Sequence, residues 1–520
     1  MIKHKQMNKH LLPKAGLLTA SALTLASLQA QENERPNIVL IYADDIGFGD
    51  FSCYGATRVQ TPHTDALADN GVRFTNAHSA AATSTPSRYG LFTGEYPWRR
   101  KGTGIAAGDA ALIIRPDRLT LPKILRQAGY TTGAVGKWHL GMGAENGKQN
   151  WNERVAPGPA EVGFDYSYIM AATGDRVPCV YMENQRAVNL DPNDPISVSY
   201  TQNFEGEPTG KENPELLTKL KPSPNHGHNQ SIVNGISRIG YMKGGKAALW
   251  EDENIADSIT VHAVRFIEKN KDRPFFLYFG TNDVHVPRFP HPRFRGKTDM
   301  GHRGDAIVQF DWSVGEVVRA LKEAGIFERT LIILSSDNGP VVDDGYADEA
   351  VARLKNHKPW GPFRGGKYST FEAGTRVPFI VHWPERVKAA TSPALVSQID
   401  MTATLAHLIG AKNTADIPAD SRDQLPAWLG KDLKGRDYVI GAGSSLTVLT
   451  PEWKYIEPSQ ALPYNVLTNT ELGNHPEEQL YHIATDRGEY DNIAKEKPEI
   501  VGEMKTILEK EKSKGVGMEL

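Results

Sequence analysis

Cysteine is nearly absent from this chain, in which Cys53 and Cys179 are the only two among 520 residues. Two cysteines cannot form the dense disulfide framework by which small secreted domains hold their fold. We therefore expect two free, mostly buried thiols and a fold that depends on hydrophobic burial. At this length the core is expected to be divided between two domains.

A strong charge of either sign is also lacking. The formal net charge is −3, with 39% hydrophobic and 23% charged residues, which is an ordinary composition for a globular protein. No basic excess supports binding to nucleic acid. Beyond residue 30 no apolar run is long enough to span a bilayer, so we expect no stable membrane insertion.

Residues 1–30 have the organisation of a signal peptide. Lysines at positions 3, 5, 9 and 14 precede an apolar run of small residues from Ala15 to Leu28, and Ser27-Leu28-Gln29-Ala30 offers a cleavage site. The apolar run is shorter than the roughly 18 residues that a membrane anchor needs. We therefore expect an exported protein, periplasmic in a Gram-negative host or else secreted.

Four apolar segments share one arrangement, in which a buried strand ends in polar residues. Segments 37–42, 131–135, 275–279 and 331–334 lead into Asp44-Asp45, Gly136-Lys137-Trp138-His139, Asn282-Asp283-Val284-His285 and Asp337-Asn338-Gly339. Such strands suit a parallel sheet covered on both faces, and helical patterns at 119–128 and 307–324 lie between them. Because ligands of open α/β sheets bind beyond the carboxyl ends of the strands, the four polar ends are expected to meet.

The fold class and the domain bounds follow from this pattern. We expect an α/β domain over residues 31–425, with a large, mostly parallel sheet sandwiched by helices. Residues 186–250 are rich in Asn, Pro, Gly and Lys with little periodicity, which indicates a long insertion near the site. Short strand-like pieces near 438–440, 453–456 and 479–481, and an amphipathic helix over 498–514, predict a smaller C-terminal α+β domain (an antiparallel sheet plus a helix) over 426–520.

Ser84 begins the most informative stretch, Ser84-Thr85-Pro86-Ser87-Arg88, which is followed by Leu91-Phe92-Thr93-Gly94. Pro86 suits the first turn of a helix. Ser84 is then expected at the helix N-terminus, where free N–H groups and the helix dipole favour an anion, and Arg88 follows one turn later. Taken alone, the motif is equally compatible with an ordinary N-cap serine.

Carboxylate and amide oxygens gather at two of the strand ends, in Asp44-Asp45 and Asp337-Asn338. Ca²⁺ takes several oxygen ligands in irregular geometry, whereas Zn²⁺ prefers nitrogen and sulfur. Either pair alone would more often be a helix cap or a turn. Together, beside Ser84, they favour a calcium site whose ion would act as Lewis acid and template.

Cationic and proton-carrying groups complete the predicted site. Lys137 and His139 stand two apart, so in extended backbone both side chains would point the same way. Lys367 lies in a glycine loop, residues 364–370, that can bring its amine to an anion. His139 and His285 are the candidate proton carriers, because histidine titrates near neutral pH.

Together these motifs resemble the signature of the formylglycine-dependent sulfatases of the alkaline-phosphatase-like superfamily, over roughly residues 35–500. The departures are Ser84 in place of the commoner Cys, and Val284 where the family often has Pro. The resemblance implies that a radical maturase oxidises Ser84 to formylglycine before export, since a cysteine-specific oxidase could not act on it. It also implies Ca²⁺ as cofactor, held by modified Ser84 with Asp44, Asp45, Asp337 and Asn338.

The family's mechanism implies a role for each residue. Hydrated formylglycine at position 84 attacks sulfur in line with the ester oxygen, and His285, with Lys367 as the alternative, protonates the departing alcohol. His139 then takes a proton from the second hydroxyl of the geminal diol, which expels sulfate and restores the aldehyde. Arg88, Lys137 and Lys367 stabilise charge on the sulfuryl oxygens.

The substrate is expected to be a sulfated carbohydrate. No membrane-facing segment suits a steroid sulfate, whereas Thr173-Gly174-Asp175-Arg176 places a carboxylate beside a guanidinium, a pair suited to sugar hydroxyls unless it is a surface ion pair. The region resembles that of galactose- and N-acetylgalactosamine-6-sulfatases, which implies exo-acting 6-O-desulfation of a galacto-configured sugar in host or algal glycans. Further pocket residues are expected at His226, His228 and Arg353.

Three alternatives stay open on the sequence. The enzyme could act on another ring position or on a gluco-configured sugar. It could be a phosphoester or phosphonate monoester hydrolase of the same superfamily. It could also be a sugar-binding protein whose Ser84 is never oxidised. The sequence does not indicate an oligomeric state.

Overall fold

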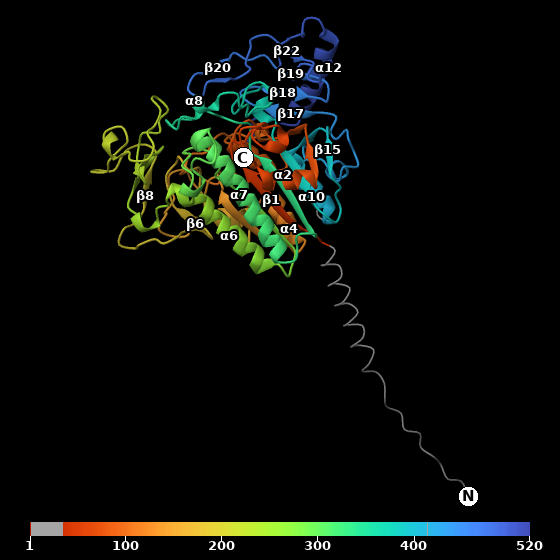
Figure 1. Ribbon diagram of the computed structural model, residues 1–520. Coiled ribbons are helices and arrows are strands. Elements are labelled where there is room, and N and C mark those ends of the chain that lie inside the picture. Colours follow the sequence, from red (N-terminus) through yellow and green to blue (C-terminus); the bar gives the residue numbers. More distant parts are fainter. Residues whose placement is uncertain (2–34, 413) are drawn as a thin grey trace.

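The structure is a computed structural model that describes Met1, residues 35–412 and residues 414–520, so the predicted signal peptide lies outside the described residues. Its centre is a sheet in the order β15-β2-β14-β13-β1-β12-β4-β5-β6-β7 (Figure 1). The strands are β1 (Asn37–Ala43), β2 (Val72–Phe74), β4 (Thr131–Lys137), β5 (Tyr166–Met170), β6 (Tyr181–Glu183), β7 (Arg186–Ala187), β12 (Phe275–Gly280), β13 (Thr330–Ser336), β14 (Phe379–His382) and β15 (Ala390–Ser392).

The middle of this sheet is parallel. Strands β13, β1, β12, β4 and β5 are paired in parallel, while β14, β6 and β7 join antiparallel toward the margins. Every residue of β1, β12 and β13 is buried, as expected for continuous apolar strands with both faces covered. The predicted fold class is confirmed.

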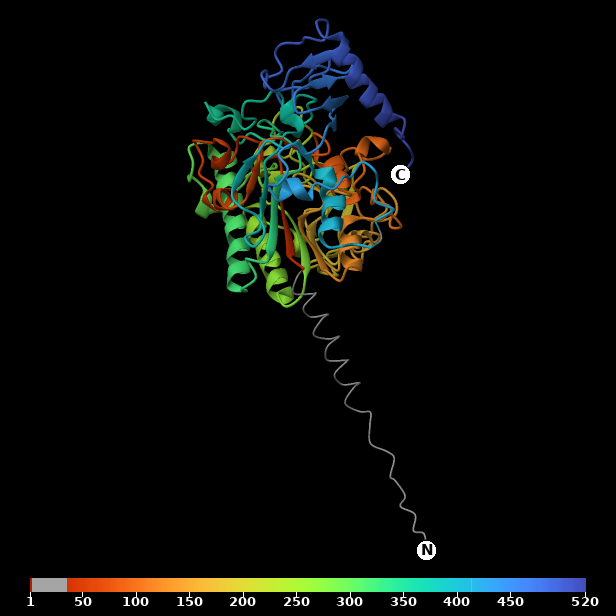
Figure 2. The same ribbon diagram turned by 90° about the vertical axis from the view of Figure 1, so that its right-hand side faces the viewer.

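Helices cover both faces of the sheet (Figure 2). One layer contains α2 (Pro62–Asp69), α6 (Ile255–Asn270) and α7 (Gly301–Glu323), and the other contains α3 (Ser84–Thr93), α4 (Leu121–Gln127) and α10 (Met401–Leu408). Strand β12 packs on both layers: Phe275 lies against Phe266 of α6, with ring centroids 5.7 Å apart, and Tyr278 against Phe92 of α3, 5.0 Å apart. Residues three apart in a strand point to opposite faces.

The remaining short helices are α5 (Pro159–Val162), α8 (Ala350–Leu354), α9 (Glu372–Thr375) and α11 (Leu425–Trp428), with 3₁₀ turns η1 (Ser52–Tyr54), η2 (Pro97–Arg99), η3 (Pro214–Leu216), η4 (Lys246–Ala248), η5 (Asp252–Asn254), η6 (Pro292–Phe294) and η7 (Gln398–Asp400). The long helix α7 begins at Gly301, earlier than residue 307 where its apolar periodicity begins. Its first turns instead bury a polar group, since Arg303 pairs with Asp50 at 2.7 Å.

Residues 186–250 form little regular structure, and they lie beside β6 at one side of the sheet (Figure 1). They contain two small antiparallel sheets, in which β8 (Ser197–Ser199) pairs with β11 (Tyr241–Lys243) and β9 (Ile232–Val233) pairs with β10 (Ile236–Ser237). Leu220 and Ile236 pack in a small cluster with Val286, which follows β12. The segment therefore packs against the loop at the carboxyl end of β12.

The C-terminal part has its own antiparallel sheet, made of β17 (Val439–Ala442), β18 (Leu446–Leu449), β19 (Lys454–Ile456) and β22 (Gln479–Tyr481). Helix α12 (Pro498–Lys512) packs on it through Val501, Met504 and Leu508. Two short pairs complete the strands, β3 (Ala77–His78) with β16 (Val396–Ser397) and β20 (Tyr464–Asn465) with β21 (Thr470–Glu471). The boundary at residues 425/426 stays a prediction; Trp428, beyond it, packs on Phe379 of the main sheet.

Two expectations about single features can be compared directly with the structure. Cys53 and Cys179 are free thiols, the first half-buried and the second buried, which confirms the prediction. Within residues 35–412 and 414–520, no helix combines the length and the apolarity that a membrane crossing requires.

Candidate active site

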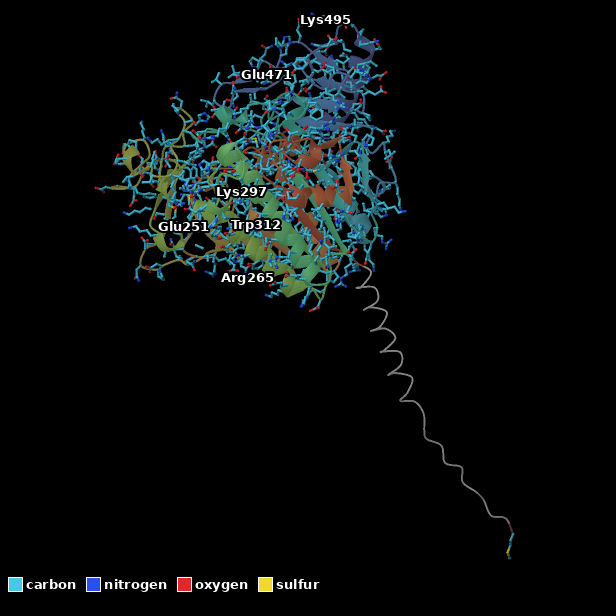
Figure 3. All side chains as sticks on the ribbon, in the orientation of Figure 1. Glu251, Arg265, Lys297, Trp312, Glu471 and Lys495 are labelled. Atoms are coloured by element: carbon cyan, nitrogen blue, oxygen red, sulfur yellow. The ribbon has the colours of Figure 1, made fainter. Side chains whose placement is uncertain are left out.

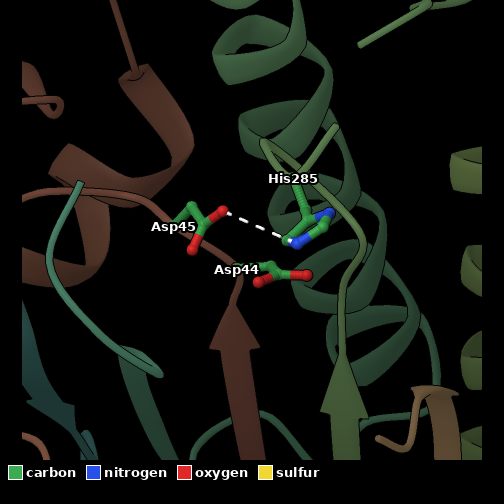
Figure 4. Close-up of side chains that lie close together, drawn as sticks. All are labelled: Asp44, Asp45 and His285. Carbon is green, nitrogen blue, oxygen red and sulfur yellow. Dashed lines mark ion pairs between the residues drawn. The ribbon is translucent and has the colours of Figure 1, made fainter. Parts of the chain in front are cut away.

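The polar ends of four neighbouring strands meet at one edge of the sheet. Asp44 and Asp45 follow β1, Lys137 ends β4, His285 follows β12 and Asp337 follows β13, and all five side chains are buried. Figure 4 shows Asp44, Asp45 and His285 converging from the ends of β1 and β12. The strand order β13-β1-β12-β4 places these four ends side by side.

The acidic groups form a cluster held by hydrogen bonds from amides. The backbone N–H of Asp45 donates to Oδ1 of Asp337 at 3.2 Å, and Nδ2 of Asn338 donates to Oδ1 of Asp45 at 2.8 Å. Oδ1 of Asp44 and Oδ1 of Asn338 are buried without a hydrogen-bond partner among the described residues. Buried oxygens without partners are unfavourable unless a cation or water satisfies them. This donor set fits a hard cation such as Ca²⁺.

His285 lies at the border of this cluster. Its Nε2 is 3.9 Å from Oδ2 of Asp45, and Asp44, Asp45 and His285 are close enough together to share an ion. The oxygen atoms of Asp337 and Asn338 would suit Ca²⁺ better than this imidazole, because Ca²⁺ takes oxygen ligands. Nδ1 of His285 donates to the carbonyl of Val286 at 2.7 Å, which leaves Nε2 available for proton transfer.

Two lysines balance the negative charge of these carboxylates. Nζ of Lys137 lies 2.5 Å from Oδ2 of Asp44, and Nζ of Lys367 lies 2.8 Å from Oδ2 of Asp45 and 3.2 Å from Oδ2 of Asp344. Although burial opposes it, Asp344 and Asp45 hold the pKa of Lys367 well above its ordinary value. Lys367 therefore carries a positive charge that can bind an anion.

Ser84 is the first residue of α3, directly after the N-cap Thr83, which confirms its predicted place at the helix N-terminus. Nε of Arg88 donates to Oγ of Ser84 at 2.9 Å, and Nη2 of Arg88 donates to Oδ2 of Asp337 at 2.8 Å. Nε2 of His139 must donate to the carbonyl of Ala106, 3.0 Å away, because a carbonyl only accepts. Nδ1 of His139 then accepts a hydrogen bond from Oγ of Ser84 at 3.2 Å.

The backbone at His139 differs from the expectation. Strand β4 ends at Lys137 and His139 has φ +53, so the extended backbone does not continue from Lys137 to His139. Lys137 and His139 both reach the site, but the argument from strand alternation is wrong. Asp45 (φ +59) and Tyr368 (φ +76) are also left-handed, and strained residues of this kind concentrate at functional sites.

Burial lowers the pKa of both histidines, His285 and His139. Burial, together with the charges of Lys367 and Lys137, lowers the pKa of His285 well below its ordinary value. Burial, with Lys137 and Arg176, does the same for His139. Both rings are therefore neutral near pH 7, in the absence of a bound anion or metal, and each has one nitrogen able to accept a proton.

A cavity of about 280 Å³ opens above these groups. The predicted residues that line it are Ser84, His139, Asp175, Arg176, His226, His228, His285 and Lys367. It is also lined by residues that the sequence analysis did not identify, namely Thr83, Ile105, Ile239, Asp344, Tyr368, Asn465, Leu467 and Thr468. Most of these come from loops without a motif, although Tyr368 directly follows Lys367.

Asp175 is the polar anchor of the cavity wall, and it is buried rather than part of a surface ion pair. Its Oδ2 accepts from Nε2 of His228 at 2.9 Å, and its Oδ1 is 3.1 Å from Nη1 of Arg176. Although burial opposes it, Arg176, His285 and His228 hold the pKa of Asp175 well below its ordinary value. The group is a carboxylate, an acceptor for hydroxyl groups in the cavity.

Arg353 does not line this cavity, so the structure does not place it with the other predicted pocket residues. It lies in α8, where Nε is 2.6 Å from Oε2 of Glu349 and 47% of its side chain is exposed. Glu349 is the N-cap residue of α8, so the two form a local ion pair at this helix.

Comparison with known proteins agrees with this geometry. A family model described as Sulfatase matches residues 36–411. The chain is 51% identical over 506 residues to an N-acetylgalactosamine-6-O-sulfatase of Bacteroides thetaiotaomicron, covering 97% of this chain and 98% of that protein. It is 31% identical over 421 residues to human steryl-sulfatase, covering 76% and 70%.

A solved structure from work on the metabolism of multiple glycosaminoglycans by Bacteroides thetaiotaomicron has the same fold. Its TM-score is 0.90 at 52% identity, and the match covers 92% of this chain and all of that one, 100%. The fold, the converging strand ends and the near-full-length identity lead to one conclusion. The chain belongs to the sulfatase family and is a sulfuric ester hydrolase.

Proposed function

We propose that this sulfatase removes the 6-O-sulfate from a terminal N-acetylgalactosamine or galactose of a glycan. The observation that carries the proposal is the buried Asp175 carboxylate, held by His228 and Arg176 in the same cavity as Ser84. A carboxylate in this position can accept hydrogen bonds from ring hydroxyls and so distinguish their configuration. The identity to an N-acetylgalactosamine-6-O-sulfatase supports the choice of sugar.

We also propose that Ser84 is oxidised to formylglycine by a radical maturase, and that Ca²⁺ is the metal. The hydrated aldehyde would supply the nucleophile, and the ion would neutralise charge on the sulfate. Its ligands would be residue 84 and the oxygens of Asp44, Asp45, Asp337 and Asn338. The buried oxygens without partners at Asp44 and Asn338 support this assignment.

The chain's own residues then bind the anion and move protons. Lys367 keeps its charge between Asp45 and Asp344, and it lies in the cavity wall with one ammonium hydrogen left for a sulfate oxygen. Nδ1 of His139 can accept a proton at residue 84, since Nε2 is committed to the carbonyl of Ala106. Nε2 of His285 accepts in the empty cavity, since Nδ1 is committed to Val286. A bound sulfate anion favours the charged ring, so Nε2 would take up a proton from water when the substrate binds and pass it to the departing sugar oxygen.

The predicted leader supports an activity outside the cytoplasm. We propose export to the periplasm or the medium, after the maturase has acted on the chain. There the enzyme would meet sulfated glycans, which are too large and too charged to cross a membrane.

A comparison of three sulfate esters and one phosphate ester tests the choice of sugar and of reaction. Sulfate release is measured from the 6-O-sulfates of N-acetylgalactosamine, galactose and N-acetylglucosamine, and phosphate release from the matching 6-phosphate of N-acetylgalactosamine. The two galacto-configured sulfates are expected to have the highest kcat/KM. Asp175→Ala should lower kcat/KM for them by about ten- to a hundredfold, the effect of losing a hydrogen bond to a charged group.

Asp272→Ala, at an exposed loop position, is the matched control and should change nothing. Preference for the gluco-configured sugar, or the same selectivity in Asp175→Ala, would overturn the assignment of Asp175. Faster hydrolysis of the phosphate than of the sulfate would favour the phosphoesterase alternative.

A further inference from the structure

A second cleft adjoins the cavity that contains Ser84. Its volume is about 290 Å³, and it lies between residues 340–365 and the hairpin of β20 and β21. Thr468 lines both spaces, and Asp343 of the cleft is followed in sequence by Asp344 of the cavity. The backbone N–H of Lys367 donates to the carbonyl of Pro340 at 2.9 Å. The cleft therefore begins at the loops that carry the anion-binding lysine.

An exposed aromatic ring stands at the wall of this cleft. Tyr490 lines it with 79% of its surface exposed. Its backbone N–H donates to Oδ2 of Asp486 at 2.9 Å, and its ring centroid lies 5.3 Å from the guanidinium carbon of Arg364. Trp360, half-buried, adds a second aromatic side chain. An aromatic ring whose face is exposed beside a cleft can stack on the apolar face of a ligand.

The charges of the cleft disfavour an acidic ligand. Arg364 is the one cation among the described residues that line it, and it already forms two hydrogen bonds with Glu471, 2.8 and 2.6 Å long (Glu471 is labelled in Figure 3). Asp343 is a further carboxylate in the wall. A ligand carboxylate would meet two like charges and a guanidinium that is already paired. Hydroxyl groups, in contrast, can donate to Asp343 and Glu471.

We propose that this cleft binds a neutral sugar linked to the sulfated one, so that the enzyme favours oligosaccharides with an uncharged neighbouring sugar. The inference rests on the proposed function, since the sulfated sugar must occupy the cavity. A sugar ring offers an apolar face to Tyr490 and hydroxyls to the carboxylates, which matches the two kinds of group in the cleft. The cleft then determines which glycan is bound, and the Asp175 side determines which sugar is desulfated.

The test uses three substrates that carry the same 6-O-sulfated N-acetylgalactosamine. It is free in the first, linked to a neutral hexose in the second and linked to a uronate in the third. The neutral disaccharide is expected to have the lowest KM. Tyr490→Ala should raise that KM about three- to tenfold, the range for one aromatic contact, with kcat and the kinetics of the free sugar unchanged.

Val261→Ala is the matched control, because Val261 is 42% exposed on α6 and lines neither space. Equal KM values for the free and the linked sugar, or an equal effect of Tyr490→Ala on both, would overturn the subsite. A lower KM for the uronate than for the hexose would overturn the preference for a neutral sugar. Hydrolysis of the free sugar tests the proposed function separately, whereas the subsite is judged by the ratio of linked to free substrate.

Discussion

The hydroxyl oxygen of Ser84 lies between a donor and an acceptor. Arg88 donates to it from one helical turn away, and Nδ1 of His139 faces it from the end of β4. Arg88 is itself fixed by Asp337. Charges held in place before the substrate arrives need no reorganisation during the reaction, which is the main source of electrostatic catalysis. Position 84 is therefore prepared for an anion on one side and for proton removal on the other.

The role of His285 leads to a prediction about leaving groups. His285→Ala should lower kcat/KM for a sugar sulfate by about a hundredfold or more, because a sugar alcohol needs protonation as it departs. An activated aryl sulfate, whose phenolate leaves without a proton, should lose much less. Steady-state kinetics on both substrates measures the difference.

His475→Ala, at an exposed position, is the control for this comparison. Equal losses on the sugar sulfate and the aryl sulfate would refute the role of His285 as the acid. The assignment would then move to Lys367, the alternative acid, which lines the same cavity.

At the scale of elements, a buried ion cluster joins the C-terminal sheet to the main domain. Nζ of Lys454, on β19, lies 3.0 Å from Oε1 of Glu372 on α9 and 3.3 Å from Oε1 of Glu489. The backbone N–H of Glu372 donates to Oε2 of Glu489 at 2.6 Å. Burial, with the nearby charge of Glu372, raises the pKa of Glu489 to about 7 against the opposing effect of Lys454.

This cluster predicts that stability falls as pH rises toward neutrality. The folded state keeps a proton on Glu489 up to about pH 7, whereas the unfolded chain releases it near its ordinary pKa of about 4.3. Between these values the unfolded state binds fewer protons, so the contribution of Glu489 is complete below the lower value and is lost as pH rises through the upper one. Glu489→Gln keeps the acceptor for the N–H of Glu372 but cannot ionise, so its Tm should depend less on pH across this window.

Thermal unfolding of the wild type and of Glu489→Gln at several pH values measures this dependence of Tm on pH. Glu477→Gln, at an exposed site, should behave like the wild type. An identical decline of Tm in Glu489→Gln and in the wild type would show that Glu489 does not hold the proton.

The elements differ in how far the sequence could predict them. Strands β1, β12 and β13 were predictable because each is a continuous apolar run followed by polar residues. The path of the backbone beyond Lys137 was not predictable, since the left-handed backbone at His139 depends on tertiary contacts. The same limit applies to Asp344 and Thr468, which come from loops without periodicity and reach the cavity only through the fold. Arg353 pairs instead with Glu349, the N-cap residue of α8, and no motif in the sequence indicates this.

At the scale of the whole molecule, metal binding should be visible in stability. The oxygen cluster of Asp44, Asp45 and Asp337 exists only in the folded state, so a bound ion stabilises that state by mass action. At a Ca²⁺ concentration about a hundred times Kd, the free energy of unfolding should rise by about 2.7 kcal/mol. Chelation should lower Tm, and added Ca²⁺ should restore it.

Asp44→Asn should weaken this calcium dependence, because it removes a charge from the ligand set, whereas Asp272→Asn should keep it. A Tm that is the same after chelation and after addition of Ca²⁺ would contradict the metal site, independently of any activity measurement. A response to Zn²⁺ in place of Ca²⁺ would contradict the choice of metal.

The central claim is that a group formed from Ser84 releases sulfate from a galacto-configured sugar. It is tested most directly by sulfate release from N-acetylgalactosamine 6-sulfate, measured for wild type and Ser84→Ala, each produced together with a serine-type maturase. Release by the wild type and none by Ser84→Ala, with both proteins unfolding at closely similar temperatures, is the result expected. Equal release by the two proteins, or none by a wild type in which the peptide containing Ser84 has lost two hydrogen atoms in mass, would contradict it.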